Sequence, residues 1–429
     1  MRIGSGARLI GTVVCALMLV ACSSAPASSP TNPSSSGAAN AVATAAPTAA
    51  AVVGTAAAKA PTTAAAAAPT VGAAVPTAVA AAPTVAAAAA AAAGAAAGAM
   101  SQADEQAWEQ QTYEAAKKEG KVTVYGFWNP DLERVTREFL AQHYPGVELE
   151  TLTTTTATDK IRTERQTGQY LVDAYLGGGT TALGLSDLGF TEKFTPPAET
   201  LATSKWKVPP SSYMSFPSLV YAIQGKGILI NTSLVPPDKE PKKWEDLLDP
   251  FWSGKKIVMD HPGRGGGPGG SWARWISDQP DLGRAYLEKL KAQDPVLDAG
   301  SAAPDIDATA RGEYAAYLPA YPSSIPQVEG APVKFIWPER TGGGTPTLVA
   351  MMKDAPHPNA AKLYLNMQVL PEYQQKIAEA LWISPNLLGV AVPDPLVSLE
   401  GRNVSVDTEA ETKRNNQWAN SEGKEIFGQ

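Results

Sequence analysis

Apolar positions after residue 103 alternate between the spacing of helices and that of strands. Leu132, Val135 and Phe139 follow the helical repeat, whereas residues 121–125 (Lys-Val-Thr-Val-Tyr) form a short β-branched run. The two patterns predict helices over 104–118, 132–140, 160–166, 271–276 and 282–290, and strands over 121–125, 147–152, 171–176 and 255–259. This alternation predicts an α/β fold with mostly parallel sheets, in which ligands bind beyond the carboxyl ends of strands.

Residues 22–103 lack either pattern. They repeat Ala-Pro-Thr units and then run almost entirely in alanine from 86 to 99. Proline-rich repeats cannot form regular ladders and this segment has no apolar face to pack, so it predicts a disordered tether. A coil of this length would span about 50 Å root-mean-square. Its serines and threonines also suit O-glycosylation, which the sequence does not decide.

The first 21 residues have the anatomy of a secretory signal. Arg2 and Arg8 precede an apolar run over 9–20 that is too short to span a bilayer. The following Leu-Val-Ala-Cys, ending at Cys22, resembles a bacterial lipobox, which predicts cleavage after residue 21 and lipidation of Cys22. Several acyl chains on one residue would hold the protein at the outer face of the cytoplasmic membrane. The alternative is an ordinary membrane anchor with an incidental cysteine.

Charge and composition exclude several classes of function for the remaining residues. Residues 101–429 carry 32 basic and 42 acidic residues, so they are a poor match for nucleic acid. Both cysteines, Cys15 and Cys22, lie within the first 22 residues, so no disulfide or cysteine-based zinc site is available to the domain. The three histidines, which are far apart in sequence, make a histidine-rich metal site unlikely, and no cofactor is expected.

Glycine-rich segments follow several of the predicted strands. They occupy 126–130, 177–181, 260–270 and 338–345. Glycine lets backbone N–H groups approach a ligand, and a helix N-terminus favours an anion. None of these segments has the spacing of a phosphate-binding loop or a dinucleotide fingerprint, and each taken alone is equally well explained as a surface turn. Their repeated position after strands favours binding.

Four segments of the chain carry a resemblance to a known family. They are 118–125, the proline- and tryptophan-containing run 241–255, Gly-Ala-Pro-Val at 330–333, and the helix entry 355–362. In this order they resemble the extracellular solute-binding proteins of ABC transporters, in the branch that includes receptors for ferric iron, polyamines, phosphonates and thiamine. The resemblance covers nearly all of residues 108–429.

The resemblance implies a two-lobed α/β fold, the type II periplasmic-binding-protein fold, with a hinge between the lobes. It places lobe 1 at about 104–218 with a return after 337, and lobe 2 at about 225–337. It also implies a monomeric, non-enzymatic receptor that captures a small molecule and delivers it to an ABC permease. Hinge closure would then enclose the ligand.

Candidate ligand residues come from the strand ends and from the family comparison. They are Trp128, Asn129, Gly178, Gly179, Thr180, Arg264, Tyr321, Arg340 and Gly343. Trp128 would stack on a ligand or serve as a surface aromatic, and either arginine would clamp an anion or face water. His261 is a weaker candidate, because a turn histidine bonded to backbone explains it as well.

Ferric iron is the alternative ligand within the same family. Iron receptors of this family use two adjacent tyrosines, because hard Fe³⁺ favours phenolate oxygen. Tyr321 matches the first of them, and Pro322 stands at the second, so the sequence favours a small organic anion over iron.

Two further classes of function remain open at this point. An enzyme would need a nucleophile–base pair or paired carboxylates, and the chain has neither GxSxG nor HExxH. A surface adhesion lipoprotein, with residues 22–103 as its stalk, is the other alternative. A ligand-induced rise in melting temperature separates a receptor from an adhesin.

Overall fold

The structure is a computed structural model that describes residues 100–201, 203–264, 267–300, 302–402 and 404–428. These residues all belong to the second of two compact units, which covers Thr77–Gln429. The predicted signal peptide, Cys22 and nearly all of the tether lie outside the described residues. Within the part of the chain described, no helix is both long and apolar enough to cross a membrane.

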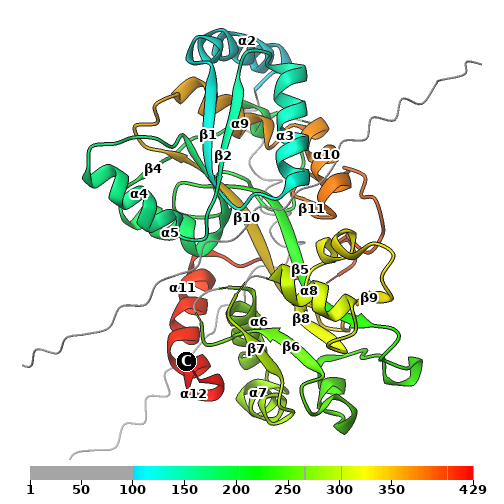
Figure 1. Cartoon of the computed structure of the whole chain (residues 1–429). Coiled ribbons are helices and arrows are strands. Elements are labelled where there is room, and N and C mark those ends of the chain that lie inside the picture. Colours follow the sequence, from blue (N-terminus) through cyan, green and yellow to red (C-terminus); the bar gives the residue numbers. More distant parts are fainter. Residues whose placement is uncertain (1–99, 202, 265–266, 301, 403, 429) are drawn as a thin grey trace, which may run out of the picture. The chain divides into compact units, whose positions relative to one another are not determined.

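Eleven strands of the described residues form one hydrogen-bonded network, with the path β2-β1-β3-β10-β5-β8-β6-β7 (Figure 1). Off this path, β4 pairs with β10, while β9 and β11 pair with β5. The strands are β1 (Lys121–Gly126), β2 (Glu148–Thr153), β3 (Ala174–Gly178), β4 (Thr191–Glu192), β5 (Leu219–Asn231), β6 (Ile257–Asp260), β7 (Val296–Asp298), β8 (Ala316–Ala320), β9 (Val333–Ile336), β10 (Gly342–Met352) and β11 (Ser384–Pro385).

Strand β5 belongs to both halves of this network. It pairs antiparallel with β10 and β11 on the side of β1–β3, and with β8 and β9 on the side of β6 and β7. Of its 13 residues, all but Gln224 are buried. One continuous strand therefore joins a first sheet, built around β1–β3, to a second sheet, built around β6–β8.

Helices cover both sheets, and Figure 1 shows α2, α3, α9 and α10 around the first sheet and α6, α7 and α8 around the second. The helices are α2 (Gln102–Glu119), α3 (Pro130–His143), α4 (Ala157–Gln166), α5 (Gly179–Asp187), α6 (Pro268–Ser277), α7 (Gly283–Ala292), α8 (Ala302–Ala310), α9 (Pro358–Met367), α10 (Pro371–Leu381), α11 (Glu409–Trp418) and α12 (Lys424–Phe427). The local sequence sets their limits. Ser101 accepts a hydrogen bond from Asp104 N at the start of α2, and Gly120 ends that helix with a φ of 80°.

Separate apolar cores pack against the two sheets. Phe139, Tyr364 and Tyr373 are fully buried in the first, and Trp244, Trp252 and Trp272 are fully buried in the second. The C-terminal residues Trp418, Ala419 and Phe427 belong to the second core. The chain therefore returns to the first sheet through β10, α9 and α10 and then ends against α6 and α7. The limits of the two lobes remain a prediction.

The predicted α/β fold is confirmed, and three details of the prediction are wrong. The sheets are not mostly parallel, because β10 and β5 run against their neighbours. The predicted strand over 171–176 begins only at Ala174, since Leu171 is 47% exposed. Residues 342–345, predicted as a loop after a strand, are the first residues of β10. Pairing with β5 gives these glycines a strand conformation that their composition does not indicate.

Glycine is required at position 227 because the backbone of β9 lies very close to β5 there. A Cβ at this position would lie 2.4 Å from the carbonyl oxygen of Ile336 in β9 and 2.5 Å from the ring of Phe335. We therefore expect Gly227→Ala to lower the free energy of unfolding by about 3 kcal/mol, because the backbone of β9 must shift. Urea denaturation measures this change.

Gly178→Ala is the matched control for this variant. A Cβ at Gly178 meets no atom within 4 Å, and the residue has an ordinary φ of −83°. This control is expected to change stability by less than about 1 kcal/mol. Equal effects of the two substitutions would show that β5 and β9 do not approach as closely as described.

Candidate ligand-binding site

The carboxyl ends of strands from both sheets are directed toward the same region. β3 runs antiparallel to β10, with Gly178 at its carboxyl end opposite Thr347 in the middle of β10, so β3 points toward the start of β10. Ala320, at the carboxyl end of β8, lies opposite Gly227 of β5. The preceding residue of β5, Lys226, lies opposite Gly342, the first residue of β10. Both sets of ends therefore point toward the segment where β5 passes from one sheet to the other. The general rule for open α/β sheets places the ligand beyond such ends.

The first sheet contributes an exposed aromatic residue to this edge. Phe127, directly after β1, is 65% exposed, the highest value among the large apolar side chains of the described residues. The next residue, Trp128, which the sequence predicts as a ligand residue, is buried instead. Its indole N–H donates to Val124 O at 3.2 Å. Asn129 caps α3 by accepting from Leu132 N at 2.8 Å. Trp128 and Asn129 therefore have local structural partners, whereas Phe127, which the sequence analysis passed over, faces solvent.

The predicted residues Gly178, Gly179 and Thr180 form the start of α5. The hydroxyl of Thr180 donates to Asn416 Oδ1 of α11 at 3.2 Å. Because Trp418 at the end of α11 is anchored in the second core, this hydrogen bond links the edge of the first sheet to the C-terminal helix. The C-terminal helix thus lies against part of the predicted ligand edge.

The second sheet contributes a buried hydrogen bond between a phenol and a carboxyl group. Tyr317 of β8 donates to Asp260 Oδ1 at the end of β6, with a distance of 3.1 Å. Burial raises the pKa of Asp260 to about 7, and the carboxyl groups of Asp305 and Asp298 add to the increase. The hydrogen bonds from Tyr317 and from the N–H of Gly269 act in the opposite direction. Asp260 therefore changes charge close to neutral pH.

Tyr321 is the predicted residue that lies closest to this pair along the chain. It follows β8 directly and begins a short 3₁₀ turn, and burial raises the pKa of its phenol. The charges of Asp260, at the end of β6, and of Asp407, in the C-terminal segment, raise the pKa of Tyr321 further. Tyr321 is therefore near carboxyl groups from both of these parts of the chain. Tyr321 and Tyr317 both remain protonated at neutral pH, and Tyr317 donates to Asp260.

Charged side chains that the sequence analysis missed are buried where β5 crosses between the sheets. Lys226 is completely buried and donates to Ser271 Oγ of α6 at 2.7 Å. Arg274 of α6 donates to Asn415 of α11, and Asn415 donates to Asp407 at 3.1 Å. A lysine between two glycines inside a long apolar strand was the signal available in the sequence.

Burial shifts the charge equilibria of the lysine and the aspartate in this cluster. It lowers the pKa of Lys226 to about 8, an effect that the charge of Asp407 partly offsets. It also raises the pKa of Asp407, and Lys226 and Arg274 oppose that change. The segment that joins the sheets therefore contains compensating charges shielded from water.

The three remaining predicted residues differ in their surroundings. Arg340 is held by Asp281 at 2.6 Å and by Glu245 at 3.4 Å, so its charge is already compensated. Arg264 is exposed, and the two glycines that follow it are outside the described residues. Gly343 lies within β10. His261 accepts from Gly263 N at 3.1 Å through Nδ1, which is the backbone arrangement considered for a turn histidine.

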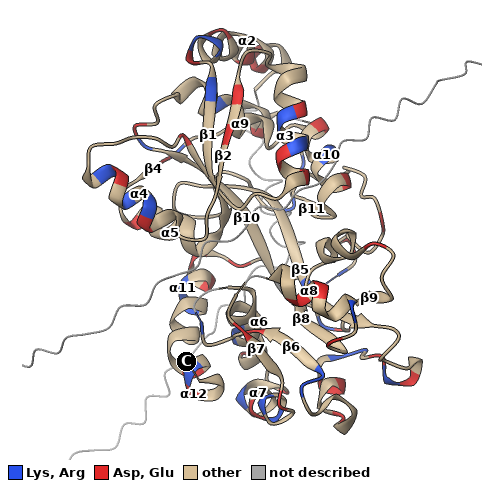
Figure 2. Ribbon diagram, viewed as in Figure 1, with Lys and Arg blue, Asp and Glu red and all other residues tan. Residues whose placement is uncertain are grey.

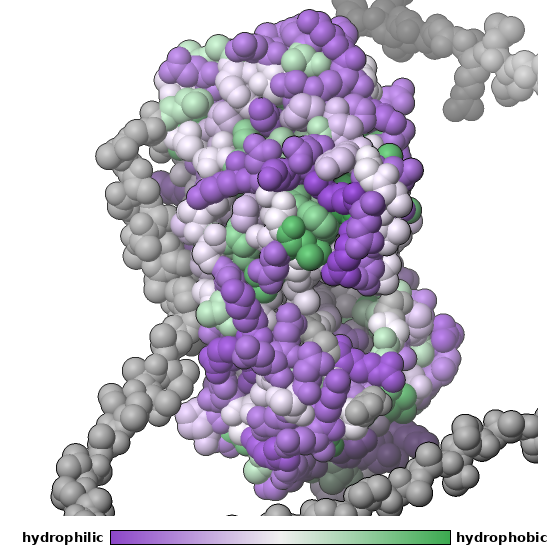
Figure 3. All heavy atoms as spheres, turned by 90° about the vertical axis from the view of Figure 1, so that its left-hand side faces the viewer, coloured by the Kyte–Doolittle hydropathy of each residue, from purple (hydrophilic) through white to green (hydrophobic). Residues whose placement is uncertain are grey.

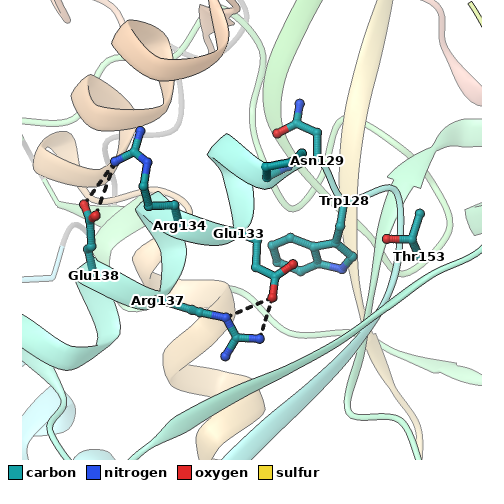
Figure 4. Close-up of a pocket in the computed structure, with 8 residues that line it drawn as sticks. Trp128, Asn129, Glu133, Arg134, Arg137, Glu138 and Thr153 are labelled. Carbon is teal, nitrogen blue, oxygen red and sulfur yellow. Dashed lines mark hydrogen bonds and ion pairs between the residues drawn. The ribbon is translucent and has the colours of Figure 1, made fainter. Parts of the chain in front are cut away.

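A hollow of about 600 Å³ lies at the carboxyl ends of β1 and β2, beside α3 (Figure 4). Trp128, Asn129 and Thr153 line it together with α3, whose Arg137 pairs with Glu133 at 2.6 Å. Arg134 of the same helix pairs with Glu138 at 3.2 Å. No residue of the second sheet lines this hollow, and its charged residues are paired with one another. Its lining therefore comes from strand ends of the first sheet and from α3, without the contribution of both sheets found at the β5 crossing.

Two observations limit what these residues can bind. Among the residues that the structure describes, no three His, Cys, Asp or Glu side chains come together as a metal site. On the face shown in Figure 3, apolar surface gathers in a patch near the middle of the molecule, with hydrophilic residues around it.

Comparison with solved structures shows which proteins share the fold. AfuA of Actinobacillus pleuropneumoniae, a periplasmic binding protein with fructose-6-phosphate bound, is 20% identical with a TM-score of 0.57, over 72% of this chain and 98% of that chain. Iron-bound HitA of Pseudomonas aeruginosa is 16% identical with a TM-score of 0.58, over 71% and 99%. An ABC-transporter substrate-binding protein of Bradyrhizobium japonicum is 18% identical with a TM-score of 0.58, over 72% and 99%. These similarities confirm the predicted two-lobed periplasmic-binding-protein fold.

Comparison with protein families is more specific. Residues 135–400 match the family described as bacterial extracellular solute-binding protein. Since the match spans more than half of the chain, the protein belongs to this family, as the resemblance of its sequence segments predicted. Curated proteins give no match to this chain.

The hydrogen bond between Tyr317 and Asp260 predicts a pH-dependent effect of mutation. A hydrogen bond to a charged carboxylate is stronger than one to a neutral carboxyl group, and Asp260 is charged above a pKa of about 7. Tyr317→Phe is therefore expected to lower the free energy of unfolding by about 1–2 kcal/mol at pH 8 and by less at pH 5.5. Chemical denaturation at the two pH values measures the difference.

Tyr314→Phe provides the control for this substitution. Tyr314 lies three residues earlier, is only partly buried and packs at the margin of the core around Tyr317. Its substitution is expected to have the same small effect at both pH values. An effect of Tyr317→Phe that does not change with pH would contradict the described pairing with Asp260.

Proposed function

We propose that this protein is the extracellular receptor of an ABC importer, which captures a small solute between its two lobes and delivers it to a membrane permease. Membership of the solute-binding family supports this proposal. The observation that carries it is the convergence of strand ends: β3 from the first sheet and β8 from the second both point to the β5 crossing. A ligand there would contact both lobes at once, which is the condition for ligand-driven closure.

The binding cycle that we propose depends on the strands that pass between the sheets. β5 and β10 are paired through residues 219–226 and 342–349, and they are the continuous connections available for bending. The free form would close when a solute makes contacts with both edges, and a monomer suffices for this cycle. Capture and transfer require recognition and release only, so the proposal includes no chemical step.

Anchoring at the membrane is a further part of the proposal. The lipobox ending at Cys22 and the Ala-Pro-Thr-rich segment support a lipid anchor followed by a tether that gives the receptor reach to its permease. The receptor would then work at the outer face of the cytoplasmic membrane. A surface adhesin would share this anchor but would lack a small ligand.

The chemical class of the solute is the least constrained part of the proposal. The sequence-based preference for an organic anion depends on the glycine-rich segments and on Arg264 and Arg340. The pairing of Arg340 with Asp281 and Glu245 weakens that argument. Ferric iron remains a second candidate, because Asp260, Tyr317 and Tyr321 supply hard oxygen atoms close to one another.

Mass spectrometry of material released by denaturing the purified protein tests the receptor function. We expect a small molecule in stoichiometric amount, because receptors of high affinity retain their ligand. Adding this molecule back to refolded protein is expected to raise the melting temperature. At a concentration one hundred times Kd, the ligand stabilises the folded state by about 2.7 kcal/mol. Release of no small molecule, together with no shift by any solute tested, would favour an adhesin.

Cys22→Ala tests the lipid anchor. The variant is expected to lose firm attachment to membranes and to retain its leader, because lipidation and cleavage both depend on this thiol. Cell fractionation with detection of the chain measures attachment, and intact-mass analysis measures processing. Firm membrane attachment after processing elsewhere in the chain would contradict the proposed anchor.

A further inference from the structure

Three carboxyl groups lie along the carboxyl edge of the second sheet, near enough to influence one another's charge. Asp260 ends β6 and Asp298 ends β7, and the two residues are direct partners in the parallel pairing of these strands. Asp305 lies in the first turn of α8, and its charge acts on Asp260. Figure 2 shows acidic positions at the start of α8 and beside β6 and β7. This edge belongs to the region where the proposed receptor would hold its solute.

None of these three carboxyl groups forms an ion pair with another described residue. Asp298 accepts a hydrogen bond from Gly300 N at 2.8 Å, and Asp260 accepts from Tyr317. Asp305 is different, because its side chain is 7% exposed and its Oδ2 has no hydrogen-bond partner. A buried carboxylate oxygen without a hydrogen-bond partner destabilises the protein, so a group that donates to it would bind favourably.

The groups around Asp260 come from the elements packed against it, and none of the described ones forms an ion pair with it. The neighbouring His261 accepts from Gly263 N through Nδ1, and burial lowers the pKa of its imidazole. Tyr317 and Tyr321 reach it from β8 and the following turn, Asp298 and Asp305 from β7 and α8, and the N–H of Gly269 from α6. Lys226 of β5 is the cation that influences it, but this ammonium donates to Ser271 and is balanced by Asp407. Among the described residues, this edge therefore has an excess of negative charge, and the donors to Asp260 and Asp298 are a phenol and backbone N–H groups.

We propose that this edge binds the positively charged group of an organic solute, an ammonium or a guanidinium. The inference rests on the proposed receptor function and names the ligand class of the same region. An ammonium or guanidinium donates several hydrogen bonds and can therefore contact carboxyl groups that are spread over β6, β7 and α8. A bare metal ion fits less well, because the described acidic side chains do not converge on one coordination site. Phe127 of the first sheet, 65% exposed, is available to cover the apolar part of such a solute.

Proton release is the expected consequence of binding such a cation. Burial raises the pKa of Asp260 to about 7 and that of Asp305 to about 6, so both carry protons part of the time near neutral pH. A bound cation favours the charged carboxylates, so it lowers both pKa values and displaces protons. Affinity for the cation therefore rises between pH 5.5 and pH 8.

Titration calorimetry of the full chain, freed of bound solute by unfolding and refolding, tests this inference. The probes are agmatine and 1,5-diaminopentane as organic cations, citrate and methylphosphonate as anions, and ferric citrate. We expect saturable binding of at least one organic cation, about tenfold tighter at pH 8 than at pH 5.5. The apparent enthalpy should change with the ionisation enthalpy of the buffer, because protons are released.

Two substitutions on α8 separate the site from a general effect of charge. Asp305→Asn removes the buried carboxylate and is expected to weaken binding of the cation about tenfold at pH 8. Asp307→Asn removes the same charge from an exposed position on the same helix and is expected to change affinity less than about twofold. Melting curves at pH 8 check the fold, and Asp305→Asn is expected to melt about 2 °C higher because it removes an unpaired buried charge.

The possible results distinguish this inference from the receptor function itself. Saturable binding of an anionic probe or of ferric iron, without binding of organic cations, would overturn the inference and leave the receptor function in place. Equal effects of Asp305→Asn and Asp307→Asn would also overturn it, as would an affinity independent of pH. If none of the probes binds, the inference fails, and the molecule released by denaturation still decides whether the protein is a receptor.

Discussion

The fold depends on one strand, β5, that satisfies its backbone hydrogen bonds in two sheets. Residues 219–226 pair with β10, and residues 227–231 pair with β8 and β9. A strand with nearly every position buried cannot leave either ladder without exposing unpaired N–H and C=O groups. The position of each sheet relative to this strand is therefore fixed by hydrogen bonding, and the ends of the neighbouring strands are fixed with it. Close approach at Gly227 shows how tightly β9 lies against this strand.

Electrostatics differ sharply between the crossing of β5 and the edge next to it. At the crossing, Lys226 and Arg274 lie near Asp407 and Asn415, so buried charges of opposite sign compensate each other. Such a cluster is costly to break, because removing one partner leaves an uncompensated buried charge. At the edge, Asp260 and Asp305 have no cationic partner among the described residues. The first arrangement stabilises the junction, whereas the second leaves Asp305 Oδ2 without a hydrogen-bond partner and is the position that we propose for a solute.

Much of the fold could be predicted from the sequence, because local patterns determine the outer elements. Periodicity indicates the strand β1 and the helices α2 and α3. The limits of α2 follow from its capping residues, Ser101 and Gly120. The crossing strands were less accessible, since glycines 342–344 indicate a loop until their pairing with β5 is known. A sheet whose two connecting strands run antiparallel to their neighbours does not follow from alternating helices and strands alone.

The candidate site was predictable only as a region. Ligands of α/β proteins bind beyond the carboxyl ends of strands, and the order of elements along the chain is enough to locate these ends. This rule indicates the segments that contain Asp260, Gly179 and Tyr321. The partners of individual side chains depend on tertiary contacts, and so the pairing of Arg340 with Asp281 was not visible in the sequence. The burial of Trp128 and the isolation of Asp305 were hidden for the same reason.

Hydrogen–deuterium exchange tests most directly whether a solute is held between strand ends of both sheets. The purified full chain would be compared before and after removal of its bound molecule by unfolding and refolding. The account predicts that the bound molecule slows exchange in peptides from both edges, those after β1 and β3 and those after β6 and β8. Protection restricted to one sheet, or to the hollow beside α3, would contradict the account.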